Sequence, residues 1–358
     1  MGLGQQTYLR YDLSTDGGTS FTTDLEPVIS KATFSRPQVT LRNDGGWEVA
    51  DSVPTVFVGS RASQFQNGPI LQNQFHVSSS MGQLNSMPFP NSELGPVSLP
   101  YELGSLSSNA EGTYWAASSD VFTKQIRIMK GEHQAVNDSI AWAENKLYNL
   151  TIPPSGPQQI NIAGDFYKSG NKYGWFSMLG NITGGYEKSI LPILGYTSNL
   201  GNSWNELIEV HLQNVDYDGD LNLELNVQQA EHITFSHESV LVVDAYGNPH
   251  LLLILSKSNT AFQFQPGTMI IADLRTTDNG QSWSLRKIDN IYTWESIWRS
   301  QNGAISQYNF PQISRSENGN HIFYSWVDSD TSYVGAPTYN LSPNLRALGY
   351  RISDKAVT

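Results

Sequence analysis

Three aspartates occupy alternate positions in one short acidic run. Asp216, Asp218 and Asp220 surround Gly219. Alternating carboxylates can converge on one hard cation, and Ca²⁺ takes about six to eight oxygen ligands. The run does not match an EF-hand loop, because Val227 stands where that loop places its bidentate glutamate. The sequence therefore offers a candidate Ca²⁺ site, with a solvated acidic loop as the alternative, and indicates no other cofactor.

A second candidate site combines two tryptophans with charged neighbours. Trp294 and Trp298 are four residues apart, and Arg299 follows directly. If they are exposed, the indole faces can stack on sugar rings while the guanidinium donates hydrogen bonds. The alternative is a pair of core aromatics. We therefore treat these three residues as candidate ligand-binding residues.

One eight-residue pattern occurs three times. It spans 14–21, 197–204 and 276–283, and reads hydroxyl, any, Asp or Asn, any, Gly, any, Ser, aromatic. Each copy follows a short apolar run. An Asp or Asn side chain can accept backbone hydrogen bonds two residues on, and Gly supplies a positive φ, so the pattern predicts a hairpin turn with its aromatic packed beneath. The defining residues are Ser14, Asp16, Gly18, Phe21, Thr197, Asn199, Gly201, Trp204, Thr276, Asp278, Gly280 and Trp283.

The pattern resembles the Asp-box (BNR) repeat of sialidase-like β-propellers. The resemblance implies an all-β fold, a β-propeller of four-stranded antiparallel blades, with about six blades (between about five and seven). It also implies that the three octapeptides are outer turns with a structural role, remote from any central pocket.

A sialidase would need further residues. That family uses an arginine triad for the substrate carboxylate, a Tyr nucleophile with a Glu partner, and an Asp acid/base. The segment around Arg36 partly matches the motif of the first arginine, but Ser35 stands at the expected arginine position. Arg36 is thus a candidate catalytic residue, and a strand-start residue is the alternative reading.

Apolar runs separated by turn residues predict paired strands. The predicted pairs are 34–41 with 53–58, 112–117 with 124–129, 158–165 with 173–179, 238–243 with 249–254, and 311–314 with 321–326. The last two pairs repeat a Gly-Asn turn followed by a histidine, which predicts that His250 and His321 occupy one equivalent, structural position. A short helix is expected around 139–146 and a loop insertion near 80–110.

The pattern extends over 1–358 and predicts one propeller domain. The chain begins in the outer half of one blade and stops after a third strand. Its ends could therefore meet in one blade, or the chain could be a segment of a longer protein, which we favour.

Composition narrows the classes of partner. With no cysteine, disulfides, thiol catalysis and Cys-based zinc sites are excluded. A net charge of −12 disfavours nucleic acid and anionic membranes. No apolar run is long enough to cross a bilayer, and the first residues show no secretory signal. The chain is therefore cytoplasmic or a trimmed exported protein, and its composition favours export.

Short segments extend the resemblance. Residues 8–18, and residues 324–330 followed by 343–346, are similar to propeller-bearing proteins exported by type IX secretion, which implies secretion and surface display. We therefore expect a monomeric, secreted or cell-surface, non-catalytic propeller that binds a glycan or protein partner through its loop face. A sialidase-type exo-glycoside hydrolase is the alternative.

Overall fold

The computed structural model describes sixteen segments of the chain. They are residues 19–20, 34–41, 55–65, 68–78, 101–108, 113–120, 125–134, 139–149, 163–166, 174–180, 191–217, 232–258, 268–292, 309–316, 318–329 and 343–357. The segments fall into two compact units. Unit 1 comprises residues 1–150 and 201–203, and unit 2 comprises 151–200 and 204–358.

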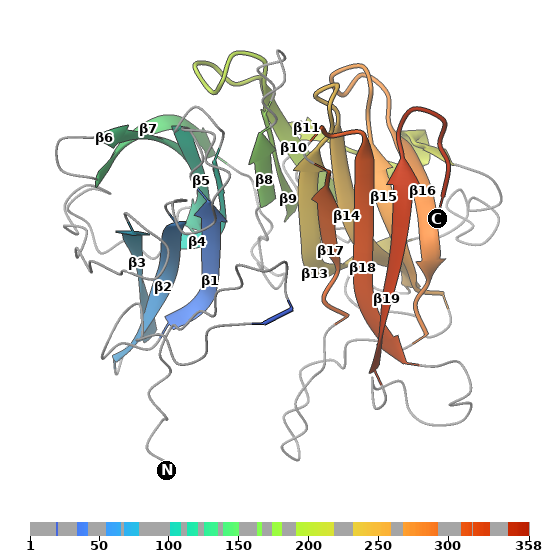
Figure 1. The fold of residues 1–358 in the computed structure, drawn as a ribbon, viewed down its shortest axis with the longest axis horizontal. Helices are drawn as coiled ribbons and strands as arrows, with labels where there is room; N and C mark the ends of the chain where they lie inside the picture. Colours follow the sequence, from blue (N-terminus) through green and yellow to red (C-terminus); the bar gives the residue numbers. More distant parts are fainter. Residues whose placement is uncertain are drawn as a thin grey trace, which may run out of the picture. The chain divides into compact units, whose positions relative to one another are not determined.

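Unit 1 contains two antiparallel sheets among its described residues (Figure 1). Sheet I has the order β1-β2-β3, with β1 Phe34–Leu41, β2 Thr55–Phe65 and β3 Gly68–Ser78. Sheet II has the order β4-β5-β6-β7, with β4 Tyr101–Ser108, β5 Thr113–Asp120, β6 Gln125–Gln134 and β7 Ser139–Asn149. The two predicted strand pairs of this region are present as β1 with β2 and β5 with β6. The first strands of the two sheets, β1 and β4, contact each other.

Two sequence predictions for unit 1 are wrong. The helix expected around 139–146 is strand β7, which pairs along its length with β6. The insertion expected at 80–110 includes β4 at 101–108, while residues 80–100 lie outside the described part. The register of β4 shifts between Leu103 and Ser105. A bulge of this kind interrupts the two-residue alternation by which a strand is recognised.

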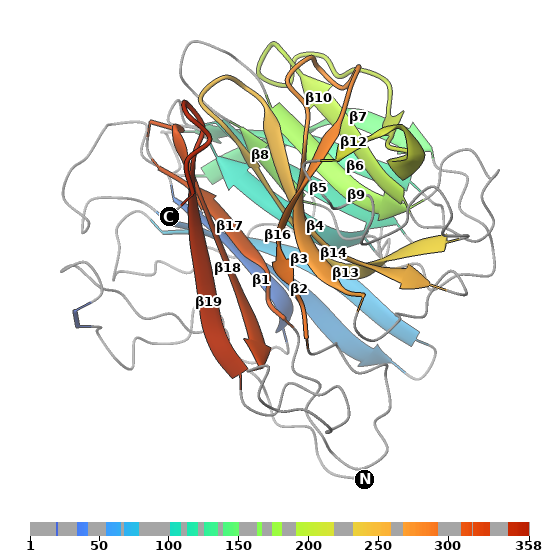
Figure 2. The ribbon, with the colours of Figure 1, turned by 90° about the vertical axis from the view of Figure 1, so that its right-hand side faces the viewer.

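Unit 2 contains three sheets among its described residues. Sheet III has the order β11-β10-β9-β8, with β8 Ala163–Phe166, β9 Gly174–Gly180, β10 Leu191–Thr197 and β11 Ile208–Glu209. Sheet IV has the order β12-β16-β15-β14-β13, with β12 Asp216–Tyr217, β13 His232–Val243, β14 Pro249–Ser258, β15 Ile270–Arg275 and β16 Ser284–Asn290. Sheet V has the order β17-β18-β19, with β17 Gln312–Arg315, β18 His321–Ser329 and β19 Pro343–Arg351 (Figure 2).

The central strands of sheet IV, β14 and β15, are buried on both faces. Along β14, Leu251, Leu253 and Leu255 belong to a core cluster that includes residues of sheet III. The intervening Leu252 and Ile254 belong to a second cluster, which includes residues of sheet V. Side chains alternate between the faces of a strand, so a strand covered on both faces needs a continuous apolar run. The run at 251–255 is therefore explained by its place between two sheets.

The first strands of the three sheets in unit 2 lie next to one another, as expected for successive propeller blades. The first strand of sheet IV, β13, contacts the first strands of its neighbours, β8 and β17. Every pairing is antiparallel among the described strands except the two-residue pairing of β12 with β16. The described part contains no α-helix and one 3₁₀ turn, at Leu212–Asn214. The predicted all-β class is confirmed in this part; the number of blades and the single-domain organisation stay predictions.

The two ends of the strands in sheets IV and V differ in the connections that they carry. β14, β16 and β18 run toward one end, as Figure 1 shows for β16 and β18. At the opposite end, which we call the turn end, short turns join β13 to β14, β15 to β16 and β17 to β18. The connections from β14 to β15, β16 to β17 and β18 to β19 leave from the first end, which we call the loop end.

Candidate functional site

The octapeptide at 276–283 is a turn that uses its own polar groups. Thr276 Oγ1 donates to Asp278 Oδ1 at 2.8 Å and accepts from the backbone N–H of Gly280 at 3.0 Å. Asp278 Oδ1 also accepts from the backbone N–H of Ser282 at 2.9 Å. Asn279 and Gly280 have φ values of 59° and 85°. Partial desolvation raises the pKa of Asp278, but the hydrogen bonds from Ser282 and Thr276 outweigh it and hold that pKa below its usual value.

The octapeptide at 197–204 repeats this geometry with an amide in place of the carboxylate. Thr197 Oγ1 donates to Asn199 Oδ1 at 2.9 Å. The next two residues, Leu200 and Gly201, have φ values of 56° and 74°. Leucine therefore occupies a left-handed position that asparagine occupies in the other copy. The polar residues in both turns stabilise the turns themselves.

The tryptophans that end these two octapeptides are buried. Trp204 packs edge-on against Phe176 of sheet III, with ring centroids 5.5 Å apart. Trp283 belongs to the core cluster that joins sheets III and IV, and its ring centroid lies 6.2 Å from that of Trp175. In the octapeptide at 14–21, only Thr19 and Ser20 are described, and Ser14, Asp16, Gly18 and Phe21 lie outside the described residues.

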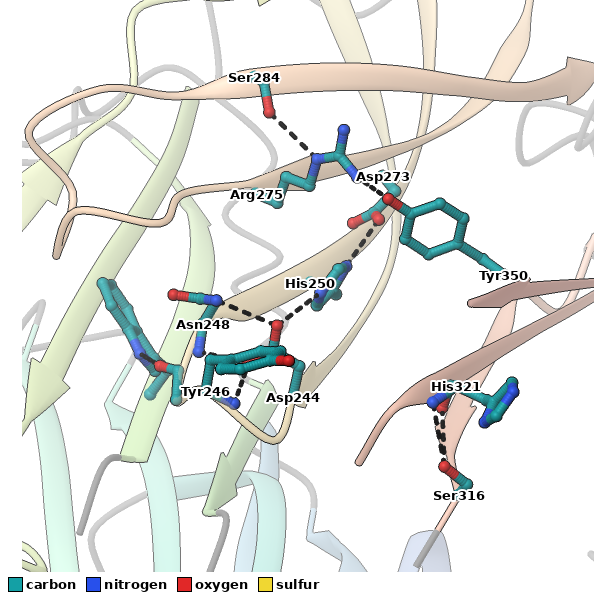
Figure 3. A network of polar contacts seen from close by, with 12 residues as sticks. Asp244, Tyr246, Asn248, His250, Asp273, Arg275, Ser284, Ser316, His321 and Tyr350 are labelled. Carbon is teal, nitrogen blue, oxygen red and sulfur yellow. Dashed lines mark hydrogen bonds and ion pairs between the residues drawn. The ribbon is translucent and has the colours of Figure 1, made fainter. Parts of the chain in front are cut away.

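The strongest cluster of titratable groups in the described part lies between sheets IV and V. His250 Nδ1 is 2.8 Å from Asp273 Oδ2, and His250 Nε2 is 3.5 Å from Asp244 Oδ2 (Figure 3). The hydroxyl of Tyr324, on β18, donates to the same Asp273 oxygen at 2.7 Å. All four side chains are nearly inaccessible, with Asp273 0% and His250 3% exposed.

The charges of this cluster stabilise one another. Burial lowers the pKa of His250, but the carboxylates of Asp273 and Asp244 outweigh it and raise that pKa to about 9. Burial raises the pKa of Asp273, but His250 and Tyr324 outweigh it and lower that pKa. Burial and the Asp273 charge raise the pKa of Tyr324 well above its usual value. The raised pKa of His250 and the lowered pKa of Asp273 favour a protonated imidazole beside the Asp273 carboxylate, and both side chains are buried.

The Asp244 turn connects three sheets. Asp244 Oδ1 accepts two backbone N–H groups of its own turn, both at 2.8 Å. Within that turn, the Gly247 carbonyl accepts from Trp175 Nε1 of sheet III at 2.9 Å. The N–H of Ala245 donates to the Gly319 carbonyl of the equivalent turn in sheet V at 3.1 Å. The buried Asp–His–Asp cluster is therefore part of the scaffold.

The histidine repeat seen in the sequence has a structural counterpart. His250 pairs with Arg275 on β15, and His321 pairs with Arg351 on β19. The two histidines are equivalent in register, as the sequence predicts. They differ in environment, because the residue equivalent to Asp273 in sheet V is Gly349.

Sequence reasoning did not single out Asp273 or Tyr324. Asp273 lies in the apolar run 270–274, where all other side chains are buried hydrophobics. A single carboxylate within an apolar strand is the sequence feature that could have indicated a buried ion pair, since a buried charge needs a partner.

The remaining predicted site residues are placed only in part. Arg36 lies in β1, and its side chain is outside the description. Asp216 is exposed in β12, and its backbone N–H donates to the Trp283 carbonyl at 2.8 Å. The other candidate residues, Asp218, Asp220, Trp294, Trp298 and Arg299, lie outside the described residues. The Ca²⁺ site stays a prediction, because two of its three aspartates are not described. In the described part, no group of three or more His, Asp or Glu side chains could hold a metal ion.

Comparisons with known proteins show distant structural likeness. No family model matches the chain, and no curated protein does. A PL25 ulvan lyase matches with 10% identity and a TM-score of 0.46, over 91% of this chain and 69% of the lyase. The β-propeller domain of the Trilobed protease from Pyrococcus furiosus gives 8% identity and a TM-score of 0.42, over 92% and 70%. The NanB sialidase of Streptococcus pneumoniae gives 8% identity and a TM-score of 0.42, over 96% of this chain and 63% of the sialidase. Likenesses this distant do not identify an activity.

Among the described residues, we find no helical segment with the length and apolar character required to span a membrane.

Proposed function

We propose that this chain is an exported, monomeric β-propeller of the Asp-box type that binds a glycan at its loop end without hydrolysing it. The observation that carries the proposal is the division between the two ends of sheets IV and V. At the turn end, the polar side chains that resemble a site (Asp278, His250, Asp273) have internal partners and stabilise turns and sheets. Ligand recognition is then left to the loop end.

The chemistry of the loop end favours a glycan. The connection from β16 to β17 carries Trp294, Trp298 and Arg299. Aromatic rings stack on the apolar faces of sugars, and guanidinium groups donate hydrogen bonds to hydroxyls. Connecting segments held by a rigid β-scaffold are the usual location of binding residues.

Two assays on one protein preparation test the proposal. We expect no turnover of a fluorogenic sialoside or of a panel of aryl glycosides, and specific binding on a glycan array. Trp294→Ala and Trp298→Ala should each weaken that binding, and neither should shift the urea unfolding midpoint.

The alternatives predict different results. Sialoside hydrolysis that Arg36→Ala abolishes without changing the unfolding midpoint would establish a sialidase-type exo-glycosidase instead. A glycan array without signal, together with capture of a defined protein partner, would replace the glycan with a protein ligand.

A further inference from the structure

A strongly exposed tyrosine lies at the loop end of sheet IV. Tyr292 follows β16 and is 50% exposed. Its backbone N–H donates to Asp328 Oδ2 at 3.0 Å, and Asp328 is fully buried at the end of β18. The preceding residue, Ile291, is buried and donates its N–H to the Met269 carbonyl at 2.9 Å. The backbone therefore fixes where this exposed ring lies.

A second exposed aromatic lies beside the same strand end. Phe310 is 52% exposed and has a φ of 44°, although a proline follows it. A positive φ is unfavourable for a bulky residue such as phenylalanine, and the following proline restricts the backbone at this position further. The buried Asn309 holds the segment, because its carbonyl accepts from the Val327 N–H at 2.7 Å and its amide donates to the Val327 carbonyl at 2.8 Å.

The two aromatics thus share one support. Tyr292 is anchored to Asp328 and Phe310 is anchored through Asn309 to Val327, which is the adjacent residue of β18. An exposed ring on a strained backbone is retained where the surrounding structure enforces it, and such positions cluster at binding sites.

An ion pair borders the tyrosine. Arg346 Nη1 lies 3.0 Å from Asp289 Oδ2, and both side chains are about one-third exposed or less, at 28% and 34%. The Arg346 guanidinium also lies 5.9 Å from the centroid of the Tyr292 ring. Arg346 is already paired with Asp289, and the Asp328 carboxylate that accepts the Tyr292 N–H is a second acidic group at the same place, so the described side chains here carry no excess positive charge. An anionic sugar would gain no free cation here, whereas neutral hydroxyls can both donate to Asp289 and accept from Arg346.

We propose that Tyr292 and Phe310 form a stacking platform for a neutral saccharide, with the Arg346–Asp289 pair hydrogen-bonding the sugar hydroxyls. The platform rests on the proposed glycan-binding function and assigns it a site and a substrate class. It adds two described aromatics to the tryptophans predicted from the sequence.

The test is an array that carries neutral and sialylated oligosaccharides together, followed by calorimetric titration of the neutral oligosaccharide that gives the strongest signal. Tyr292→Ala and Phe310→Gly should each weaken binding about tenfold, the loss expected for one stacked ring. Glycine suits the positive φ at position 310, so that variant removes the ring without added strain. Tyr292→Phe should retain the affinity.

Tyr246→Ala is the matched control, because this tyrosine is 57% exposed but lies in a turn at the opposite end. The Tyr246→Ala variant should bind the neutral oligosaccharide with the same affinity as the unmodified protein. If the protein binds glycans and neither Tyr292→Ala nor Phe310→Gly weakens binding, the platform is wrong while the function stands. If binding is confined to sialylated glycans, the neutral class is wrong. If nothing on the array binds, both the function and the platform are wrong.

Discussion

Asp273 illustrates how burial decides the role of a charged residue. Exposed, a carboxylate beside a histidine and a tyrosine would be a candidate acid/base centre. Here all three groups are inaccessible, and the carboxylate is paired with His250 and Tyr324. A buried ion pair of this kind is costly to break, since removal of one partner leaves an unpaired charge. We therefore assign the cluster to the cohesion of sheets IV and V.

The cluster predicts a specific pH dependence. The pKa of His250 is raised to about 9 from 6.5. The unfolded state therefore loses this proton first, so the stabilisation is complete below about pH 6.5 and is lost as the pH rises through about 9. Because one unit of pKa shift corresponds to about 1.36 kcal/mol, the unfolding free energy should fall by about 3 kcal/mol over this range. The measurement is the urea unfolding free energy between pH 6 and pH 10, in steps of about half a unit.

Two variants check the assignment to His250. His250→Gln should lower the unfolding free energy at pH 6 and flatten its decline toward pH 9. His321→Gln should leave the decline intact, because His321 is half-buried and lacks the equivalent carboxylate. An unchanged pH slope in His250→Gln would contradict the assignment.

Replacing Leu200 by asparagine should make the protein more stable. It has a φ of 56°, a region that costs most L-residues about 1–2 kcal/mol and that asparagine tolerates better. Leu200→Asn should therefore raise the unfolding free energy by about 0.5–1 kcal/mol. The reverse change in the other turn, Asn279→Leu, should lower it by a similar amount. Thermal unfolding of the two variants measures both effects, and a loss of stability in Leu200→Asn would contradict the strain argument.

At the scale of elements, strands with a strong local pattern are predictable from the sequence. The apolar runs 238–243 and 249–254 correctly predict β13 and β14 with their Gly247 turn. β4 was missed because a bulge breaks its alternation, and β7 was mistaken for a helix although it lies opposite β6 along its length. Pairing with a neighbouring strand decides such segments, and local propensity does not.

Close packing of neighbouring strands makes one glycine of sheet III essential. Gly195 on β10 pairs with Phe176 on β9, and a Cβ at position 195 would lie 2.2 Å from Phe176 Cε1. Phe176 is 1% exposed, so its ring cannot move into solvent. Gly195→Ala should cost about 1–3 kcal/mol in unfolding free energy. Adding Phe176→Leu to that variant should recover part of the loss, and strict additivity of the two changes would contradict the direct clash.

At the scale of the whole molecule, the scaffold could be predicted further than the site. The octapeptides predict turns because their side chains bond within eight residues, as the hydrogen bonds of Thr276 and Asp278 illustrate. The pairing of Asp273 with Tyr324 joins residues 51 positions apart on different sheets. No local spacing encodes such a contact. The same holds for Tyr292 and Phe310, whose common support on β18 depends on how two sheets pack.

Stability should also be distributed unevenly over the chain. Strands β14 and β15 are hydrogen-bonded on both edges, and their side chains between 251 and 255 and between 270 and 274 are buried on both faces. In contrast, β19 pairs with β18 and carries exposed residues such as Leu345, which is 76% exposed. Opening free energies range from near zero at exposed edges to the global value in core strands. Amides of 251–255 should therefore exchange with deuterium at least about a hundredfold more slowly than those of 344–348. Peptide-resolved mass spectrometry measures both segments in one experiment, and equal exchange rates would show that sheet IV is not the stable centre of unit 2.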